Sequence, residues 1–230
     1  MARFAVILPA AGQSSRFGGG DKKPFLDLAG RPVWRWSAER FLARPDVCQC
    51  IIVVAPEDQE TFRRRFGADL SGRPIRIAEG GRERFESVAN ALALLADDAD
   101  HVAVHDAARP CVTDDLIDRV FARAAETGAA LAAVPVTDTI KRGDEHGQVL
   151  ATVPRQGLWL AQTPQAFRRD WLLAAYAGRS RFGPVTDDAQ LVEAAGHPVY
   201  LVHGSAANRK ITTREDLTLA EALLRQAVGG

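Results

Sequence analysis

The stretch from Phe4 to Phe25 decides the fold, and it reads FAVILPAAGQSSRFGGGDKKPF. Residues 4–8 form a short apolar run, and its length and its neighbouring Pro and Gly favour a buried parallel strand over a helix. The small residues Pro9–Gly12 follow, and small side chains let the backbone approach another group closely. Beyond them lie Arg16, three consecutive glycines and Lys23. A small cationic loop after a buried strand is typical of a polyphosphate site, and the alternative is an ordinary exposed loop with solvated charges.

Apolar runs and amphipathic stretches alternate along the rest of the chain. We expect further strands at residues 50–55, 75–78, 101–105, 130–135 and 199–202. We expect helices at residues 31–42, 56–66, 113–127, 167–177 and 213–227, and two more that follow Gly80-Gly81 and Thr186 and end near Leu95 and Ala195. Near-continuous apolar strands that alternate with helices predict a three-layer α/β fold with a mostly parallel sheet.

One segment interrupts this alternation. Residues 136–140 and 149–153 are β-like, and the residues between them are polar and rich in turn formers, which predicts a β-hairpin arm over about residues 136–156. A two-stranded hairpin cannot bury its own side chains, so we expect it to pack against a second copy of the chain in a homodimer. The sequence shows no linker, repeat or low-complexity tract, and one domain over residues 1–230 is the simplest partition.

Composition excludes several classes of function. Lys plus Arg and Asp plus Glu both number 29, so the chain lacks the overall positive charge that favours nucleic acid. No apolar run reaches the length of a membrane span, and Met1-Ala2-Arg3 leads directly into the first strand without a signal-peptide pattern. Three sparse cysteines fit a reducing compartment, so we expect a cytoplasmic protein with no nucleic acid or membrane partner.

Charged residues gather where parallel strands are expected to end, which is where open α/β sheets bind ligands. Gly80-Gly81 precedes a helix start, a geometry that suits an anion or a base. Asp106 and Arg109 follow the expected strand 101–105, and a simple ion pair between them that closes the turn is the alternative interpretation. The polar residues expected at this edge are Arg16, Lys23, Asp106, Arg109, Thr186, Asp187 and Lys210.

Several cations with one or two carboxylates suit a highly anionic substrate with a divalent metal. Phosphoryl-type transfer needs cations to neutralise the phosphate oxygens and hold the nucleophile in line. We expect Mg²⁺, held mainly by phosphate oxygens with one protein carboxylate. The opening loop lacks both the P-loop pattern and the dinucleotide fingerprint, and no Gly-x-Ser-x-Gly motif occurs, so hydride transfer and serine hydrolysis are disfavoured.

Six motifs in order carry a family resemblance. They are Pro9-Ala10-Ala11-Gly12 with Arg16 and Lys23, Gly80-Gly81-x-x-Arg84-x-x-Ser87-Val88, Val104-His105-Asp106-Ala107-Ala108-Arg109-Pro110, Asp138-Thr139-Ile140-Lys141, Thr163-Pro164-Gln165 and Thr186-Asp187-Asp188. The first resembles the signature loop of the sugar-nucleotidyltransferase superfamily. Together they resemble the 2-C-methyl-D-erythritol 4-phosphate cytidylyltransferases of the non-mevalonate isoprenoid pathway, which implies a Rossmann-like nucleotidyltransferase fold.

The resemblance implies that CTP and methylerythritol phosphate react directly, without a covalent enzyme intermediate, and release pyrophosphate. It implies catalytic roles for four residues. Arg16 and Lys23 match residues that stabilise charge at the α-phosphate, Lys210 matches a contact to the acceptor phosphate, and Arg155 matches an arm residue that reaches a neighbouring subunit's site.

The resemblance also implies a substrate-binding set. Its members are Ala10, Ala11, Gly12, Gly81 and Ser87 around the cytidine, Asp106 near the ribose, Ala107 beside it, Arg109 at the acceptor phosphate, Thr139 on the arm, and Thr163 and Thr186 as lesser contacts. Asp106 is the implied metal-binding carboxylate.

Some positions depart from the family pattern. Ser14 stands where a glycine is common and Lys22 where a proline is common, so Lys22 and Lys23 both remain candidates for the α-phosphate; the spacing from Arg16 favours Lys23. A cytidylyltransferase for another polyol phosphate, such as ribitol 5-phosphate, is an alternative, and so is a nucleotide-binding regulatory protein without turnover. The chain ends at Gly230 without a fused cyclodiphosphate synthase, so we expect the monofunctional form.

Overall fold

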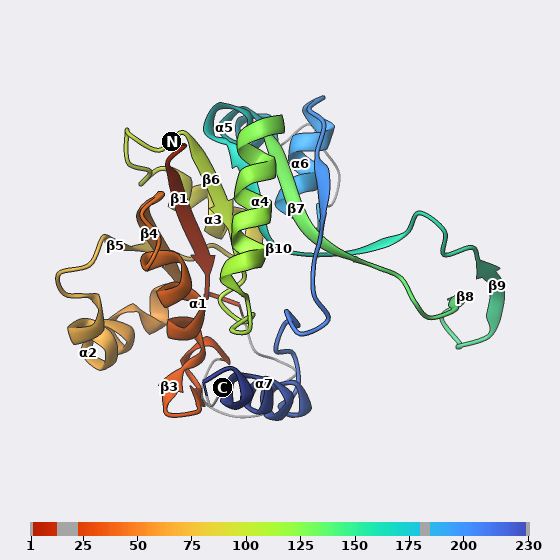
Figure 1. Cartoon of the computed structure of the whole chain (residues 1–230), viewed down its shortest axis with the longest axis horizontal. Helices are drawn as coiled ribbons and strands as arrows, with labels where there is room; N and C mark the ends of the chain where they lie inside the picture. Colours follow the sequence, from red (N-terminus) through yellow and green to blue (C-terminus); the bar gives the residue numbers. More distant parts are fainter. Residues whose placement is uncertain (1, 13–22, 180–184, 229–230) are drawn as a thin grey trace.

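The computed structural model describes residues 2–12, 23–179 and 185–228. Its centre is a seven-stranded sheet with the strand order β11–β7–β10–β6–β1–β4–β5 (Figure 1). The central strand β1 pairs in parallel with β4 and β6, and β10 is antiparallel to both of its neighbours. The strands are β1 (Phe4–Pro9), β4 (Val47–Val54), β5 (Ile75–Glu79), β6 (His101–Val104), β7 (Ala129–Pro135), β10 (Trp159–Arg168) and β11 (Tyr200–His203).

Helices cover both faces of this sheet. They are α1 (Val33–Leu42), α2 (Gln59–Leu70), α3 (Arg84–Leu92), α4 (Asp114–Thr127), α5 (Arg169–Ala177), α6 (Asp188–Ala194) and α7 (Arg214–Val228). Side chains of β1 alternate between the two faces, as strand geometry requires. Val6 and Leu8 join the core with α1, α2 and α4, whereas Ile7 joins the core with α3, α5 and α6. The predicted three-layer α/β fold with a mostly parallel sheet is confirmed.

A third, smaller core lies below the sheet edge that carries the site. There, α7 packs with the short antiparallel pair β2 (Asp27–Leu28) and β3 (Arg31–Pro32). The helix expected at residues 31–42 therefore begins at Val33, because Pro32 is its N-cap residue in an extended conformation. Two 3-10 turns, η1 (Lys23–Phe25) and η2 (Pro56–Asp58), complete this side of the molecule.

The β-hairpin arm leaves the body of the molecule between β7 and β10 (Figure 1). It consists of β8 (Ile140–Gly143) and β9 (Val149–Val153). The first strand expected at residues 136–140 is wrong in its bounds, because the strand begins only at Ile140. Pairing with β9 starts at Ile140, opposite Val153, and the turn after Gly143 is closed by the Asp144 carboxylate, which accepts hydrogen bonds from the N–H groups of His146 and Gln148.

The strand β10 is a correction to the sequence prediction, which placed no strand there and started a helix at Phe167. Phe167 is a buried strand residue, and α5 begins at Arg169. The pairing of β10 with β7 shifts register between Ala161 and Gln165. The buried Gln162, Thr163 and Gln165 in and beside this irregular segment are polar, so the alternation that usually indicates a strand is absent from the sequence.

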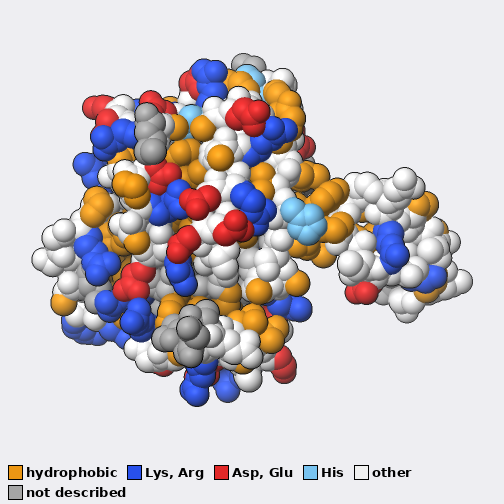
Figure 2. All heavy atoms as spheres, in the orientation of Figure 1, with side chains coloured by type: hydrophobic (Ala, Val, Ile, Leu, Met, Phe, Trp, Pro, Cys, Tyr) orange, Lys and Arg blue, Asp and Glu red, His pale blue; other side chains and the backbone are white. Residues whose placement is uncertain are grey.

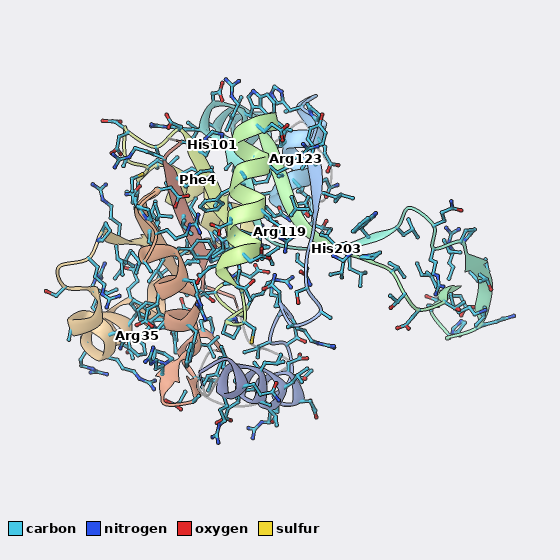
Figure 3. All side chains as sticks on the ribbon, in the orientation of Figure 1. Phe4, Arg35, His101, Arg119, Arg123 and His203 are labelled. Atoms are coloured by element: carbon cyan, nitrogen blue, oxygen red, sulfur yellow. The ribbon has the colours of Figure 1, made fainter. Side chains whose placement is uncertain are left out.

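The edge strand β11 is held by two arginines of α4, labelled in Figure 3. The Arg119 guanidinium donates to the His203 carbonyl over 2.5 Å, and the Arg123 guanidinium lies 4.6 Å from the ring centre of Tyr200. Around this strand and the root of the arm, Figure 2 shows hydrophobic side chains gathered on the surface. Among the described helices, none is long and apolar enough to cross a membrane.

Candidate active site

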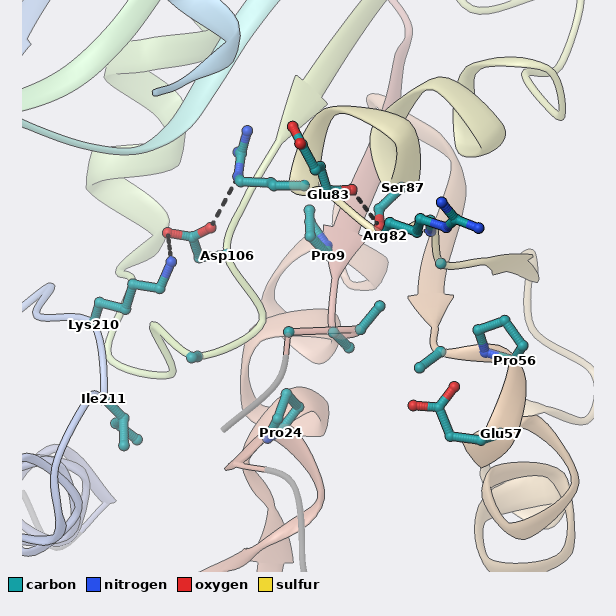
Figure 4. A pocket seen from close by; sticks show the side chains of 18 of the residues that line it. Pro9, Pro24, Pro56, Glu57, Arg82, Glu83, Ser87, Asp106, Lys210 and Ile211 are labelled. Atoms are coloured by element: carbon teal, nitrogen blue, oxygen red, sulfur yellow. Dashed lines mark hydrogen bonds and ion pairs between the residues drawn. The ribbon is translucent and has the colours of Figure 1, made fainter. Parts of the chain in front are cut away.

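A cavity of about 530 Å³ opens at the carboxyl ends of β1, β4, β5 and β6, where the sequence predicted the site. Its lining comes from six separate segments: the end of β1, η1, the start of η2, the turn before α3, the loop after β6 and the segment before α7. Figure 4 shows Asp106 and Lys210 on one side of this cavity and Ser87, Arg82 and Pro56 on the other. Parallel strands therefore deliver residues far apart in sequence to one edge.

The small residues of the cavity are required by close backbone packing. The Ala10 N–H donates to the Val53 carbonyl over 2.9 Å, and the Gly80 N–H donates to the Val54 carbonyl over 2.8 Å. A Cβ atom on Gly80 would lie 2.4 Å from the Ala11 Cβ, so only glycine fits. This side of the cavity consequently offers backbone groups and small side chains to a ligand.

The turn before α3 is held by Ser87 and Glu86. Ser87 is 4% exposed; its hydroxyl accepts a hydrogen bond from the Gly81 N–H over 3.0 Å and donates to the Glu83 carbonyl over 3.2 Å. The Glu86 carboxylate accepts from the N–H groups of Arg82 and Glu83. The loop is thus fixed before a ligand arrives, which lowers the entropic cost of binding.

Asp106 is the electrostatic centre of the cavity. Its Oδ2 lies 3.1 Å from the Lys210 Nζ and 3.3 Å from the Arg109 Nε, and its Oδ1 lies 3.9 Å from the Arg84 Nε. Burial opposes ionisation of Asp106, but Lys210, Arg84 and Arg109 outweigh it and hold the pKa of this carboxyl well below its usual range. Asp106 is therefore an ionised carboxylate at neutral pH.

Thr163 and His105 fix the backbone at Asp106. The Asp106 N–H donates to the Thr163 Oγ1 over 3.0 Å, and this hydroxyl lies 3.1 Å from the His105 Nδ1. The His105 Nε2 lies 3.2 Å from the Arg109 carbonyl. Burial lowers the pKa of His105 to about 4, so the ring is neutral at pH 7 and we assign its proton to Nε2, which donates to that carbonyl.

The segment that carries Lys210 is tied to the irregular part of β10. The Asn208 side-chain amide donates to the Thr163 carbonyl over 2.8 Å, and the Asn208 carbonyl accepts from the Arg109 guanidinium over 2.9 Å. The Gln162 side-chain amide donates to the Ser205 carbonyl over 2.8 Å. Lys210 itself is 44% exposed, so its ammonium group faces the cavity from a well-anchored backbone.

Comparisons with known proteins decide the family. The family model described as "2-C-methyl-D-erythritol 4-phosphate cytidylyltransferase" matches residues 4–226.

The chain belongs to the 2-C-methyl-D-erythritol 4-phosphate cytidylyltransferase family.

Individual relatives in this family align with nearly the whole chain. The chain is 46% identical to the 2-C-methyl-D-erythritol 4-phosphate cytidylyltransferase of Rhodopirellula baltica, an alignment that covers 98% of this chain and 96% of that protein. It is 44% identical to the enzyme of that name from Pelotomaculum thermopropionicum, with 100% and 97% covered. The crystal structure of the Thermus thermophilus 2-C-methyl-D-erythritol 4-phosphate cytidylyltransferase superposes with a TM-score of 0.80 at 36% identity, covering 98% of this chain and 100% of that one.

Seven of the residues that the cytidylyltransferase resemblance singled out meet at this cavity. Its lining includes Ala10, Ala11, Gly12, Gly81, Ser87, Asp106 and Lys210. Thr163 and Arg109 are in contact with Asp106 but are themselves largely buried. The ion pair between Asp106 and Arg109, which was the alternative reading of this turn, is present beside the pairs with Lys210 and Arg84.

Other predicted residues lie elsewhere. Ala107 is fully buried, and its carbonyl accepts from the Ser37 hydroxyl; its neighbour Ala108 lines the cavity instead. The Thr186 hydroxyl donates to Gln190 beside the start of α6, and Thr186 is not part of the cavity lining. Thr139 and Arg155 are exposed on the arm, where the Arg155 guanidinium contacts the Thr137 carbonyl. Their ligand contacts stay predictions.

The remaining catalytic predictions fall at the opening loop. Arg16, Ser14 and Lys22 lie outside the described residues. Lys23 begins η1, in which Pro24 lines the cavity and Phe25 packs against Phe62, with ring centres 5.4 Å apart. Phe25 therefore anchors η1 to α2 beside the cavity.

Sequence reasoning missed the roles of three residues, Arg84 in the cavity wall and Asp188 and Tyr176, which are not among its lining residues. Arg84 was quoted within a motif without a role, yet its guanidinium lies between Asp106 and Asp188. Asp188 also accepts from the Tyr176 hydroxyl. The separation of Arg84 from Asp188, 104 positions in sequence, left no local signal for this contact.

Proposed function

We propose that this chain transfers the cytidylyl group of CTP to 2-C-methyl-D-erythritol 4-phosphate and releases pyrophosphate, as a step of non-mevalonate isoprenoid biosynthesis. The observation that carries the proposal is the match to the family over residues 4–226, combined with an ionised Asp106 among three cations in the cavity. The named relatives are cytidylyltransferases for this acceptor, and none named here acts on ribitol 5-phosphate.

The reaction is a direct displacement at phosphorus. An oxygen of the acceptor's phosphate attacks the α-phosphorus of CTP and forms a new P–O bond, while the bond to the bridging oxygen of pyrophosphate breaks. Negative charge grows on the phosphate oxygens, and fixed cations stabilise that charge most in the transition state. Lys210 supplies such a cation from the described cavity wall, and we assign Arg16 and Lys23 the same task at the α-phosphate.

The cavity's shape suits a small base. A Cβ atom on Gly80 would clash with Ala11 and one on Gly81 with Glu86, so both positions require glycine, and the Ser87 hydroxyl fixes the loop that would contact the base. We propose that cytosine lies on this side and that the phosphates point toward η1 and Lys210.

The residues present fit one Mg²⁺ ion shared with the nucleotide. Among the described residues, no group of three or more His, Cys, Asp or Glu side chains could hold a metal ion. Asp106 is ionised, and its Oδ1 has its cation neighbour 3.9 Å away, so this oxygen is available to a metal whose other ligands are phosphate oxygens and water. When bound, Mg²⁺ would neutralise charge on the triphosphate.

We propose a homodimer formed through the arm, acting in the cytoplasm. Leu160, Leu201 and Leu150 are 58%, 48% and 59% exposed in the single chain, on the arm and on strands at its root. Apolar side chains clustered in this way mark interaction surfaces. The three cysteines are free thiols, in keeping with a reducing compartment.

One assay tests the proposed function. The purified chain with CTP, Mg²⁺ and 2-C-methyl-D-erythritol 4-phosphate should release pyrophosphate, and omission of either substrate should abolish the signal. Ribitol 5-phosphate at the same concentration is the matched acceptor. Turnover with ribitol 5-phosphate alone would assign the chain the other acceptor, and silence with both acceptors would favour the regulatory alternative.

A further inference from the structure

Arg84 occupies an unusual position in the cavity wall. It is the first residue of α3, lines the cavity and is 31% exposed through its side chain. Two carboxylates compete for its guanidinium. The Nη2 atom lies 2.7 Å from the Asp188 Oδ2, whereas the Nε atom lies 3.9 Å from the Asp106 Oδ1. The first distance is a charge-assisted hydrogen bond and the second is too long for one.

Asp188 lies behind the cavity and is almost fully buried. Its side chain is 1% exposed, and besides Arg84 it accepts a hydrogen bond from the Tyr176 hydroxyl over 2.5 Å. Burial and the Asp188 charge strongly raise the pKa of Tyr176, so this hydroxyl keeps its proton and always acts as a donor to Asp188. Asp188 therefore has two fixed donors and is a strong anchor for the arginine.

The position of Asp188 is itself fixed. It follows the N-cap Asp187, whose carboxylate accepts from the Gln190 N–H and from the Gln165 side-chain amide. The Gln165 side-chain oxygen Oε1 accepts from the Ala189 N–H over 3.1 Å. Because Gln165 belongs to β10, the start of α6 is fastened to the central sheet, and Asp188 can hold Arg84 in a defined place.

We propose that Asp188 and Tyr176 are positioning residues for nucleotide binding, which hold the Arg84 guanidinium in the cavity wall and away from Asp106. This inference rests on the proposed function, because the ligand concerned is a nucleoside triphosphate. Without the Asp188 charge, Arg84 would move the short distance to Asp106 and bind its Oδ1. Asp106 would then lose the carboxylate oxygen that is open to the ribose or the metal, and the Arg84 cation would leave its place in the cavity wall.

The test is the affinity for CTP, measured by calorimetry and accompanied by KM and kcat. Asp188→Asn keeps the shape but removes the charge, and we expect the Kd and KM for CTP to rise about tenfold with a smaller change in kcat, because the contact forms in the ground state. Tyr176→Phe retains the ion pair and should raise both about twofold to fivefold. Asp46→Asn is the matched control, because Asp46 pairs with Arg44, with both side chains about 15% exposed, far from the cavity; its Kd for CTP should stay within twofold of wild type.

A double-mutant cycle separates positioning from general loosening. Arg84→Gln alone should weaken CTP binding, and Asp188→Asn added to it should cause no further loss. A folded Asp188→Asn protein with wild-type CTP affinity would overturn the proposal. It would also be overturned if Asp188→Asn weakened CTP binding by the same factor in the wild-type chain and in the Arg84→Gln chain. If Asp188→Asn does not fold, Tyr176→Phe replaces it in the same double-mutant cycle. An unchanged affinity of Tyr176→Phe for CTP would then overturn the proposal. A wild-type chain that binds no CTP would instead refute the proposed function.

Discussion

The cavity and the arm differ in how far one chain satisfies their side chains. At the cavity, Asp106, Ser87, Thr163 and Asn208 each have defined hydrogen-bond partners, and the polar groups are fixed by the fold of one chain. On the arm, Val149 and Leu150 are more than half exposed, and Arg155 is exposed and is not part of the cavity lining of its own chain. The polar groups of the cavity are thus held in place within one chain, whereas the arm leaves apolar surface uncovered, which agrees with our proposal that the arm serves a second chain.

The largest expected effect comes from the cavity side of this comparison. Lys210→Ala removes a cation whose Nζ is 3.1 Å from Asp106 and whose charge we assign to the transition state. By analogy with the loss of a single oxyanion donor, kcat/KM should fall about 10²–10³-fold, roughly 3–4 kcal/mol. Steady-state pyrophosphate release measures the change, and the thermal midpoint should stay within about 2 °C of wild type because Lys210 is half exposed.

Arg209→Ala is the matched control for Lys210. Arg209 is the neighbouring cation, 66% exposed, and its Nε lies 2.8 Å from Asp216 instead of Asp106. We expect it to keep activity within about threefold of wild type. An equal loss of activity in the two variants would mean that activity depends on the structure of the segment before α7 and not on the charge beside Asp106.

The second effect tests the arm. Arg155→Ala should lower kcat/KM about 10²-fold although Arg155 is distant from its own cavity, because we place it in the site of a neighbouring chain. An equal mixture of Arg155→Ala and Lys23→Ala chains should then regain about a quarter of wild-type activity, since half of the dimers are mixed and each has one intact site. If subunit exchange is shown and no activity returns, the two residues do not serve a shared site.

The third effect concerns the surface at the root of the arm. Leu160→Ser combined with Leu201→Ser should convert the proposed dimer into a monomer, because both residues are about half exposed in one chain and a partner would cover them. Sedimentation velocity measures the oligomeric state. Leu219→Ser on α7, where Leu219 is 47% exposed, is the control and should leave that state unchanged. A double variant that stays dimeric would place the interface elsewhere.

Sequence reasoning succeeded where short apolar strands end in small or charged residues. Ala10, Gly81 and Asp106 each follow such a strand, so the parallel sheet alone brings them to one edge. It failed at β10, because the polar residues Gln162 and Thr163 are buried by specific hydrogen bonds that no periodicity reveals.

Prediction from the sequence was also limited because one motif can have either a structural or a ligand-binding role. Thr186-Asp187-Asp188 was taken both as a helix start and as a ligand contact. The structure shows the first use, with Asp187 as N-cap, and gives Asp188 to Arg84. A local pattern predicts the cap because the cap is local, whereas the partner of Asp188 is set by packing between distant elements.

The smallest expected effect concerns Asp216, which stabilises the start of α7 beside the cavity. Asp216 accepts hydrogen bonds from the N–H groups of Thr212 and Thr213 at the start of α7, just after Lys210. Burial opposes its ionisation, but these bonds, the Thr212 hydroxyl and Arg209 lower the pKa of Asp216 to about 2. A lowered pKa in the folded state adds stability above the unfolded value of about 3.9, and this stability is lost as pH falls toward 2.

Asp216→Asn should therefore lower the free energy of unfolding by about 1–2 kcal/mol at pH 6, and the difference from wild type should shrink between pH 4 and pH 2. Denaturant titrations at several pH values measure it. Glu221→Gln, which affects only the exposed pair of Glu221 with Arg225, is the control and should change stability by less than about 0.5 kcal/mol at every pH. A difference that persists undiminished at pH 2 would show that the Asp216 side chain stabilises α7 through packing and not through its charge, and the anchoring of Lys210 would then not depend on an ionised cap.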